Sequence, residues 1–294
     1  MNSNRQQATA GSTTPSSVRA RSGVTIGAGI IDATRTWSAL ATSALTQRAA
    51  VVSDKTEASG PSVKWLAARL MLVVALSSLP ILAISAHVFG LMSERTTAVL
   101  VILPLAGATA AVFAFAPHRT DGIIGRGLVV GMVACGVYDA FRLFAVYALG
   151  LMGDFIPTMG TWVTGNPDIH DGAVVGYIWR YIGDGGGLGV AFFVVAFVVG
   201  LDRWSNRPHR VVLAAVGYAV FPVWAGLIGT VALAPHGEEL MFRLTPNTVT
   251  ITLIGHVIFG LVLGLGFLRA AERFQLPASA AEHRSEMLAV AQPA

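Results

Sequence analysis

The chain has 294 residues, of which 54% are hydrophobic and only 12% are charged, about half the charged fraction of an average soluble protein. This composition excludes a soluble domain, which needs more charges to cover its surface, and it excludes intrinsic disorder for most of the chain. The single cysteine excludes a disulfide scaffold, and the net charge of +4 is spread between apolar blocks, which favours a membrane protein over a nucleic-acid-binding one.

Residues 1–62 differ from the rest of the chain and are predicted to form a cytoplasmic tail. The stretch 10–17 (AGSTTPSS) has low complexity and is typical of disorder. Between residues 26 and 45, apolar residues recur at roughly helical spacing, so an amphipathic helix lying on the membrane surface is the alternative. The first 30 residues contain no apolar segment of the kind found in secretory signals.

Long apolar runs follow Pro61 and predict six membrane-spanning helices, because a span needs about 20 apolar residues to cross about 30 Å of hydrocarbon. The expected spans cover residues 66–91, 97–116, 126–149, 174–200, 211–233 and 248–268. Backbone groups in lipid must bond within their own segment, which makes these spans helical. The prediction is an all-α fold, a six-helix bundle within a membrane domain of residues 63–270, followed by a cytoplasmic tail of residues 271–294.

The basic residues predict the orientation of this bundle, because they accumulate on the cytoplasmic side of a membrane. Near the span ends, one side carries ten lysines and arginines, whereas the other side carries only Arg95 and Arg243. The ten are Lys55, Lys64, Arg119, Arg126, Arg203, Arg207, Arg210, Arg269, Arg273 and Arg284. Both termini are therefore predicted to be cytoplasmic, and the connection of residues 150–173 is predicted to face outward.

A layer of polar residues lies inside the expected spans. The third and fourth spans each present one Asp and one Arg a helical turn apart, with tyrosines beside them, and the sixth span adds a histidine. The predicted layer consists of Asp139, Arg142, Arg180, Asp184 and His256, with Tyr138, Tyr177 and Tyr181. At a rise of about 1.5 Å per residue, the five ionisable residues fall in the outer half of the bilayer. An ionised group near the bilayer centre costs at least about 2.5–3.5 kcal/mol, so these groups are expected to face inward and to pair or line water.

This layer has several interpretations. It is either an interhelical ion-pair lock between the third and fourth spans, or a site for a polar or anionic solute or a proton relay, in which arginine binds the anion. A further alternative is that Arg142 extends outward to the interface. His256 is either a packed helix-interface residue or a member of the layer whose charge changes near neutral pH. Cys135 is expected to be a small buried residue without a further role.

Small residues predict close packing in two spans. Gly260 and Gly264 follow His256 at intervals of four residues, a pattern that lets two helices approach closely. The glycine run 185–187 is either a similar packing strip or a local break of the helix, as in the binding sites of transporters. Pro222 is expected to kink the fifth span.

The outer connections offer imidazoles and carboxylates to a metal ion. The candidate ligands are Asp168, His170, Asp171, His236, Glu238 and Glu239. Mixed nitrogen and oxygen ligands suit zinc, iron or manganese, but the spacing matches no known metal motif, and solvated acidic loops explain these residues equally well. No cofactor is predicted, and a metal ion at these loops is the alternative.

Two segments, 126–134 (RGLVVGMVA) and 255–264 (GHVIFGLVLG), resemble the first and last spans of YagU-like bacterial inner-membrane proteins. That group has a glycine-rich opening span and a closing histidine followed by glycines. The resemblance covers residues 125–268. It implies a membrane protein of unknown activity and adds no catalytic residue.

The expected location is the bacterial plasma membrane, because the basic residues are almost all arginines and Ala, Val and Gly are abundant, as in GC-rich bacterial genomes. The first functional hypothesis is binding or transport of a small polar solute or ion through the polar layer. The alternatives are a non-catalytic membrane subunit or assembly factor and, less favoured, a metal-dependent membrane enzyme with an extracytoplasmic site. The expected partners are the lipid bilayer and a second copy or another membrane subunit, but not nucleic acid.

Overall fold

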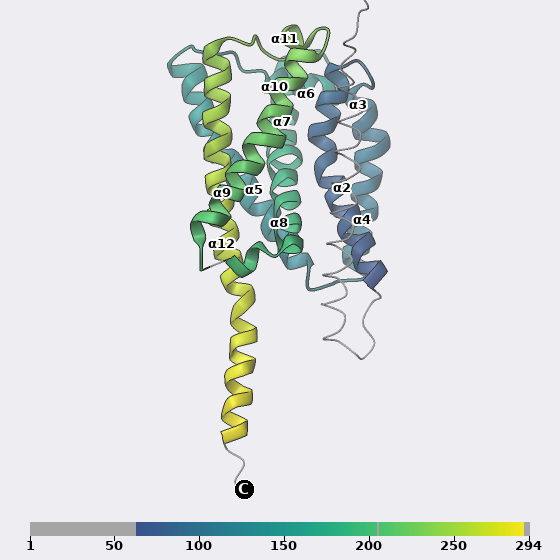
Figure 1. Cartoon of the computed structure of the whole chain (residues 1–294). Helices are drawn as coiled ribbons and strands as arrows, with labels where there is room; N and C mark the ends of the chain where they lie inside the picture. The colour runs from purple at the N-terminus through teal and green to yellow at the C-terminus, as the bar shows by residue number, and fades with distance from the viewer. Residues whose placement is uncertain (1–62, 205, 291–294) are drawn as a thin grey trace, which may run out of the picture. The chain divides into compact units, whose positions relative to one another are not determined.

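Six long apolar helices dominate the part of the chain that the structure describes (Figure 1). The computed structural model describes residues 63–204 and 206–290, and the expectations for residues 1–62 and 291–294 lie outside it. Every regular element of the described residues is a helix, which confirms the predicted all-α class. The six helices long and apolar enough to cross a membrane are Lys64–Val88, Glu94–Phe115, Asp121–Ala148, Ile169–Val199, Pro208–Leu233 and Pro246–Ala271.

The helices begin a few residues before the expected spans, and acidic residues stabilise two of these starts. Asp121 occupies the first turn of its helix, where the helix dipole favours negative charge. Asp168 immediately precedes the fourth span, and its carboxylate accepts a hydrogen bond of 2.8 Å from the backbone N–H of His170. These acidic residues therefore belong to helix ends rather than to long connecting loops.

Several spans consist of consecutive segments in which α-helical hydrogen bonding changes to π-helical bonding and back. In chain order the elements are α2 (Val63–Val88), α3 (Glu94–Thr97), η1 (Ala98–Ile102), α4 (Leu103–Phe115), α5 (Asp121–Leu143), η2 (Phe144–Ala148), α6 (Ile156–Thr164), α7 (Ile169–Ile178), η3 (Trp179–Gly186), α8 (Gly187–Val199), η4 (Leu201–Trp204), α9 (Pro208–Tyr218), η5 (Ala219–Trp224), α10 (Ala225–Leu233), α11 (Gly237–Leu240) and α12 (Pro246–Val290). Pro222, expected to kink the fifth span, lies in the π-helical segment η5, where its missing N–H removes one backbone donor.

Helix α5 packs against both α8 and α12, and glycines permit these close approaches. Gly131 of α5 faces Gly185 and Gly189, and a Cβ atom at Gly131 would overlap the backbone of both. On α12, Gly260 and Gly264 approach the backbone of α9 in the same way. The predicted close packing is confirmed in both spans. The glycine run after Asp184 does not break the helix, because it lies where η3 continues into α8.

The connection between the third and fourth spans contains a short helix, α6, that packs against α7. Gly165 ends α6 with a φ of +69°, a left-handed conformation that glycine adopts without strain. Gly160 and Gly172 bring the two helices into backbone contact. The sequence predicted that this connection faces outward, but it did not predict that the connection contains a helix.

Candidate functional site

The predicted polar layer comes together where α5, η3 and α12 meet. Asp139 and Arg142 lie three residues apart and therefore share the buried face of α5. Arg180 and Asp184 come from η3, and His256 comes from α12. Asp139 is 0% exposed and Arg142 and Asp184 are each 2% exposed, so the charges point away from the surface of the bundle.

Arg142 is the centre of a network of hydrogen bonds, called closed here because all three of its guanidinium nitrogens are bonded. The buried Oδ2 of Asp139 has no partner among the described residues. The Nε of Arg142 donates to Asp139 Oδ1 at 3.0 Å, one terminal nitrogen donates to Asp154 Oδ1 at 2.8 Å, and the other donates to the Tyr177 hydroxyl at 3.2 Å. The Tyr177 hydroxyl in turn donates to Asp154 Oδ2 at 2.8 Å. Arg142 does reach toward the end of its span, but its guanidinium ends on Asp154 rather than in water.

Asp154 joins this network from the connection between the third and fourth spans, and the sequence analysis did not include it in the polar layer. Its side chain is 8% exposed, and the backbone N–H of Ile156 and the Tyr147 hydroxyl also donate to it, at 3.2 and 3.1 Å. Burial by itself would raise the pKa of Asp154, but the hydrogen bonds and charge of Arg142, with the Tyr177 hydroxyl, lower that pKa below its ordinary value. Asp154 therefore ties the outer connection to the polar layer as a carboxylate.

The opposite side of the layer keeps unused hydrogen-bonding atoms. Arg180 donates to Asp139 Oδ1 at 3.4 Å, and its guanidinium carbon lies 4.9 Å from the centre of the Tyr138 ring. The Nε of Arg180 and the Oδ1 of Asp184 are both buried and have no hydrogen-bond partner among the described residues. The charges of the predicted layer are therefore not all paired with one another. Asp184 Oδ1 has no partner among the described residues, whereas Asp154 pairs with Arg142.

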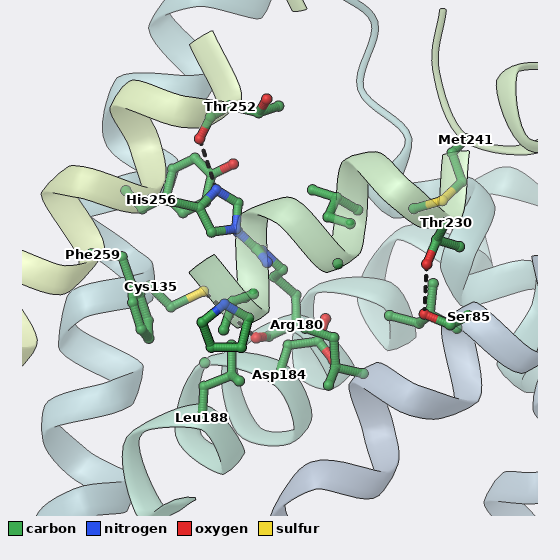
Figure 2. Close-up of a pocket in the computed structure, with 18 of the residues that line it drawn as sticks. Ser85, Cys135, Arg180, Asp184, Leu188, Thr230, Met241, Thr252, His256 and Phe259 are labelled. Carbon is green, nitrogen blue, oxygen red and sulfur yellow. Dashed lines mark hydrogen bonds between the residues drawn. The ribbon is translucent and has the colours of Figure 1, made fainter. Parts of the chain in front are cut away.

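His256 contributes an imidazole to this open side. Its Nδ1 lies 2.7 Å from the carbonyl oxygen of Thr252, and since a carbonyl only accepts, Nδ1 carries the hydrogen. The ring centre lies 5.1 Å from that of Tyr138, on which Arg180 also stacks. In Figure 2, His256, Arg180 and Asp184 border the same pocket.

That pocket is a cavity of about 550 Å³ among the helices, within the range of small-molecule sites. Five of the six spans line it, the exception being Glu94–Phe115. Its polar wall contains Arg142, Arg180, Asp184 and His256, and the rest is mainly apolar. Residues from the outer connections, including Met152, Phe155, Met241 and Phe242, border one end.

The remaining members of the predicted layer support its two sides. Tyr177 belongs to the closed network, and Tyr181 stacks on it with ring centres 6.2 Å apart. Tyr138 lies between Arg180 and His256. Cys135, expected to be buried, lines the cavity, and its Sγ lies 3.6 Å from the carbonyl oxygen of Arg180.

Glu94 is a second residue that sequence reasoning missed. It lies at the start of α3 and is 0% exposed, and neither carboxyl oxygen has a hydrogen-bond partner among the described residues. Its backbone N–H donates to His87 Nδ1 at 3.3 Å. The only sequence signal was an acid adjoining an apolar run.

A separate ion pair lies at the opposite ends of the spans. Arg69 of α2 donates to both carboxyl oxygens of Asp121 at 2.6 Å and to the carbonyl oxygen of Ala116 at 2.6 Å. The guanidinium carbon of Arg69 also lies 4.7 Å from the centre of the Phe113 ring. This pair connects α2 to the start of α5 and contributes nothing to the cavity lining.

The outer-loop metal candidates remain on the surface. Asp168, His170 and Asp171 lie at the start of α7 and are exposed; His236, Glu238 and Glu239 lie around α11 and are also exposed. The closest pair is His236 and Glu239, at 3.2 Å. Within residues 64–204 and 206–271, whose side chains are described, no group of three or more such side chains is arranged to hold a metal ion.

The fold and the buried site together define a multi-pass α-helical membrane protein. No protein-family model matches the chain, and neither a curated protein nor a solved structure matches it. The resemblance to YagU-like proteins therefore stays a prediction.

Proposed function

We propose that this protein binds a small polar solute or ion in the central cavity and carries it across the membrane. The supporting observation is that Arg180 Nε and Asp184 Oδ1 are buried, have no hydrogen-bond partner among the described residues, and belong to residues that line the same cavity. A buried donor or acceptor without a partner costs about 1–3 kcal/mol, and more when it is charged. A bound solute that supplies the missing partners removes this cost.

The unpaired atoms favour a solute that has both an acceptor and a donor. Arg180 carries positive charge and offers hydrogens to an anionic or carbonyl oxygen, whereas Asp184 offers an oxygen to a donor or a cation. The Nε2 of His256 is a further acceptor when the ring is neutral. Because the rest of the cavity is mainly apolar, these few groups set the orientation of the solute.

The proposed location is the bacterial plasma membrane, with both termini in the cytoplasm. The bias of basic residues between the two ends of the spans supports this orientation. The cavity end bordered by Met152 and Phe242 then faces outward.

A thermal-shift screen tests the binding function. Purified protein in detergent is heated with small carboxylates, amino acids, amides and inorganic anions, and the Tm is followed by tryptophan fluorescence. A ligand at about 100 times its Kd stabilises the folded state by about 2.7 kcal/mol. At least one solute is expected to raise the Tm of the unmodified protein and of Arg243→Gln, a control at an exposed arginine. Arg180→Gln and Asp184→Asn are expected to lose the shift and, in proteoliposomes, uptake of the same solute.

A second candidate function, a non-catalytic membrane subunit, is favoured by the closed network of Arg142. All three nitrogens of its guanidinium are already bonded to Asp139, Asp154 or Tyr177, as in a structural lock. If the lock is the only role of the layer, Arg180→Gln and Asp139→Asn both reduce the amount of folded protein. The same solute shift in Arg180→Gln as in the unmodified protein would contradict the binding function.

A further inference from the structure

The carboxyl group of Glu94 lies inside the bundle without a hydrogen bond. Glu94 is 0% exposed, and neither of its side-chain oxygens has a partner among the described residues. An ionised carboxylate in such a place loses its hydration and gains no interaction in exchange, which costs several kcal/mol. Glu94 therefore needs either a counterion or a proton.

Among the described residues, the elements packed around Glu94 bring no counterion to it. Helix α3 packs against α2, η1 and α6, and neither η1 nor α6 contains an ionisable residue. At this end of α2 the ionisable residue is His87, whose Nδ1 accepts a hydrogen bond of 3.3 Å from the backbone N–H of Glu94. Arg95 is exposed, and its side chain lies against Gly165. Besides burial, the influence on Glu94 is the charge of Asp184, which is another acid.

The buried acids in this part of the bundle outnumber the arginines. Each member of the group acts electrostatically on at least one other member. The group consists of four largely buried acids and two arginines, namely Glu94, Asp139, Asp154, Asp184, Arg142 and Arg180. If all six were ionised, the group would carry two uncompensated negative charges. His256 does not supply the missing charge, because the nearby Arg180 repels a positive charge on its ring. Since uncompensated charge is costly in lipid, we expect the group to take up a cation.

Asp184 connects Glu94 to the central cavity. Asp184 lines the cavity, and its buried Oδ1 has no hydrogen-bond partner among the described residues (Figure 2). The charges of Arg180 and Asp139 also act on Asp184. Glu94 itself does not line the cavity. A cation that enters from the cavity therefore meets Asp184 before Glu94.

We propose that Glu94 and Asp184 form a proton-binding site that is loaded from the cavity. A proton from cavity water binds a carboxylate oxygen of Asp184 and then moves, through an intervening water, to a carboxylate oxygen of Glu94. An O–H bond forms on Glu94, and Asp184 returns to its ionised form. The proton site does not depend on the solute-binding function, but its coupling to transport rests on that proposed function.

A proton suits this pair of acids better than a metal ion does. A proton needs one carboxyl oxygen, whereas hard metal ions such as calcium and magnesium take about six or more oxygen ligands. In the part of the chain whose side chains are described, no group of three or more histidine, cysteine or acidic side chains is placed to hold such an ion. Protonation also removes the negative charge from the buried site.

Infrared spectroscopy of the purified full-length chain tests the proton site, because a protonated carboxyl group has a C=O stretching band that an ionised one lacks. The unmodified protein is expected to show this band at neutral pH and to lose it at strongly alkaline pH. Glu94→Gln is expected to lack the band, and Glu94→Asp is expected to shift it, so the assignment survives if one variant folds poorly. The matched control Glu239→Gln changes an exposed acid of the outer connection and is expected to keep the band.

Transfer of the protein into deuterium oxide tests the route through Asp184. The band moves to lower frequency as deuterium replaces the carboxyl proton. In Asp184→Asn this exchange is expected to be at least about a hundredfold slower, the lower end of what a positioned proton carrier contributes. Asp171→Asn, at an exposed acid of α7, is expected to exchange at the rate of the unmodified protein.

Absence of the band from the unmodified protein at neutral pH would overturn the proton site. Loss of the band when sodium chloride replaces choline chloride would overturn it as well and would assign the pair to sodium. An unchanged exchange rate in Asp184→Asn would overturn the route from the cavity.

Uptake by proteoliposomes tests the coupling to transport. A pH gradient is expected to accelerate solute uptake by the unmodified protein. Glu94→Gln is expected to keep the Tm shift with the solute but to lose this acceleration. Equal uptake by the unmodified protein with and without the gradient would overturn the coupling. Failure of every solute to shift the Tm would count against the proposed function alone, because the infrared measurements contain no solute.

Discussion

The polar layer divides into two parts that differ in how completely each side chain is satisfied. Arg142 uses its whole guanidinium in hydrogen bonds, whereas Arg180 keeps a buried Nε without a partner among the described residues. Both arginines share one acceptor, Asp139 Oδ1. Arginine and aspartate therefore form a rigid support around Arg142. Around Arg180 they leave hydrogen-bonding atoms that a ligand can use.

Asp154 leads to a prediction about pH. Its pKa is lowered in the folded protein relative to its ordinary value of 3.8, so it stabilises the fold fully above that value and less as the pH falls through the folded pKa. Asp154→Asn is expected to reduce stability at pH 7 by about 1.5–3 kcal/mol, the contribution of a hydrogen bond to a charged group. We expect the Tm difference between Asp154→Asn and the unmodified protein, measured in detergent, to stay constant between about pH 5 and pH 7. This difference is expected to shrink as the pH falls below the ordinary pKa of Asp154.

The control for this measurement is Asp171→Asn. Asp171 is exposed at the start of α7, and its carboxylate accepts a hydrogen bond of 3.3 Å from the exposed side chain of Asn166. We expect its Tm to follow that of the unmodified protein across the pH range. A Tm difference for Asp154→Asn that persists unchanged at low pH would show that the carboxylate charge is not what stabilises the connection.

At the scale of the helix, the site depends on the contact between α5 and the η3–α8 segment. Gly131, Gly185 and Gly189 allow the two backbones to touch, and this approach sets the separation between Asp139 and Arg180. Arg180 and Asp184 both lie in the π-helical segment η3. Such π segments inside α-helices are frequent at functional sites.

Gly131→Ala is expected to destabilise the protein by about 1–3 kcal/mol, the usual cost of overpacking, because its methyl group overlaps the backbone of the facing helix. The matched control on the same helix is Gly136→Ala, whose Cβ would meet only the Tyr181 ring at 3.9 Å, an ordinary contact. Thermal unfolding in detergent measures both variants. An equal Tm for the two would contradict the proposed backbone contact.

At the scale of the whole molecule, the orientation of the bundle is open to a direct test. The only cysteine, Cys135, is buried, and Cys135→Ala gives a background without thiols. In that background, Arg243→Cys is expected to react with a membrane-impermeant maleimide in intact cells, because Arg243 is exposed and lies in a connection that the basic-residue bias predicts to face outward. Arg119→Cys is expected to react only after lysis. The reverse labelling pattern would place the termini outside.

The all-α class and the six spans were predictable because hydrocarbon leaves a backbone few choices, and the signal covers more than 20 residues at a time. The buried face of α5 was also predictable, since the spacing of Asp139 and Arg142 acts within one helix. The burial of Asp154 and Glu94 was not predictable, because an acidic residue next to an apolar run is expected to be solvated unless another part of the chain covers it. The cavity depends on gaps between five spans, and no local pattern records such gaps.

The arrangement of these charges also bears on how the protein enters its membrane during synthesis. The segment Asp121–Ala148 carries Asp139 and Arg142 into lipid, and each ionised group costs about 2.5–3.5 kcal/mol on the scale of translocon insertion. Asp154 emerges soon afterwards, but Arg180 follows only after about 40 residues, or roughly 2–8 s of translation at about 5–20 residues per second. We therefore expect the third and fourth spans to enter the membrane together, as one helical hairpin.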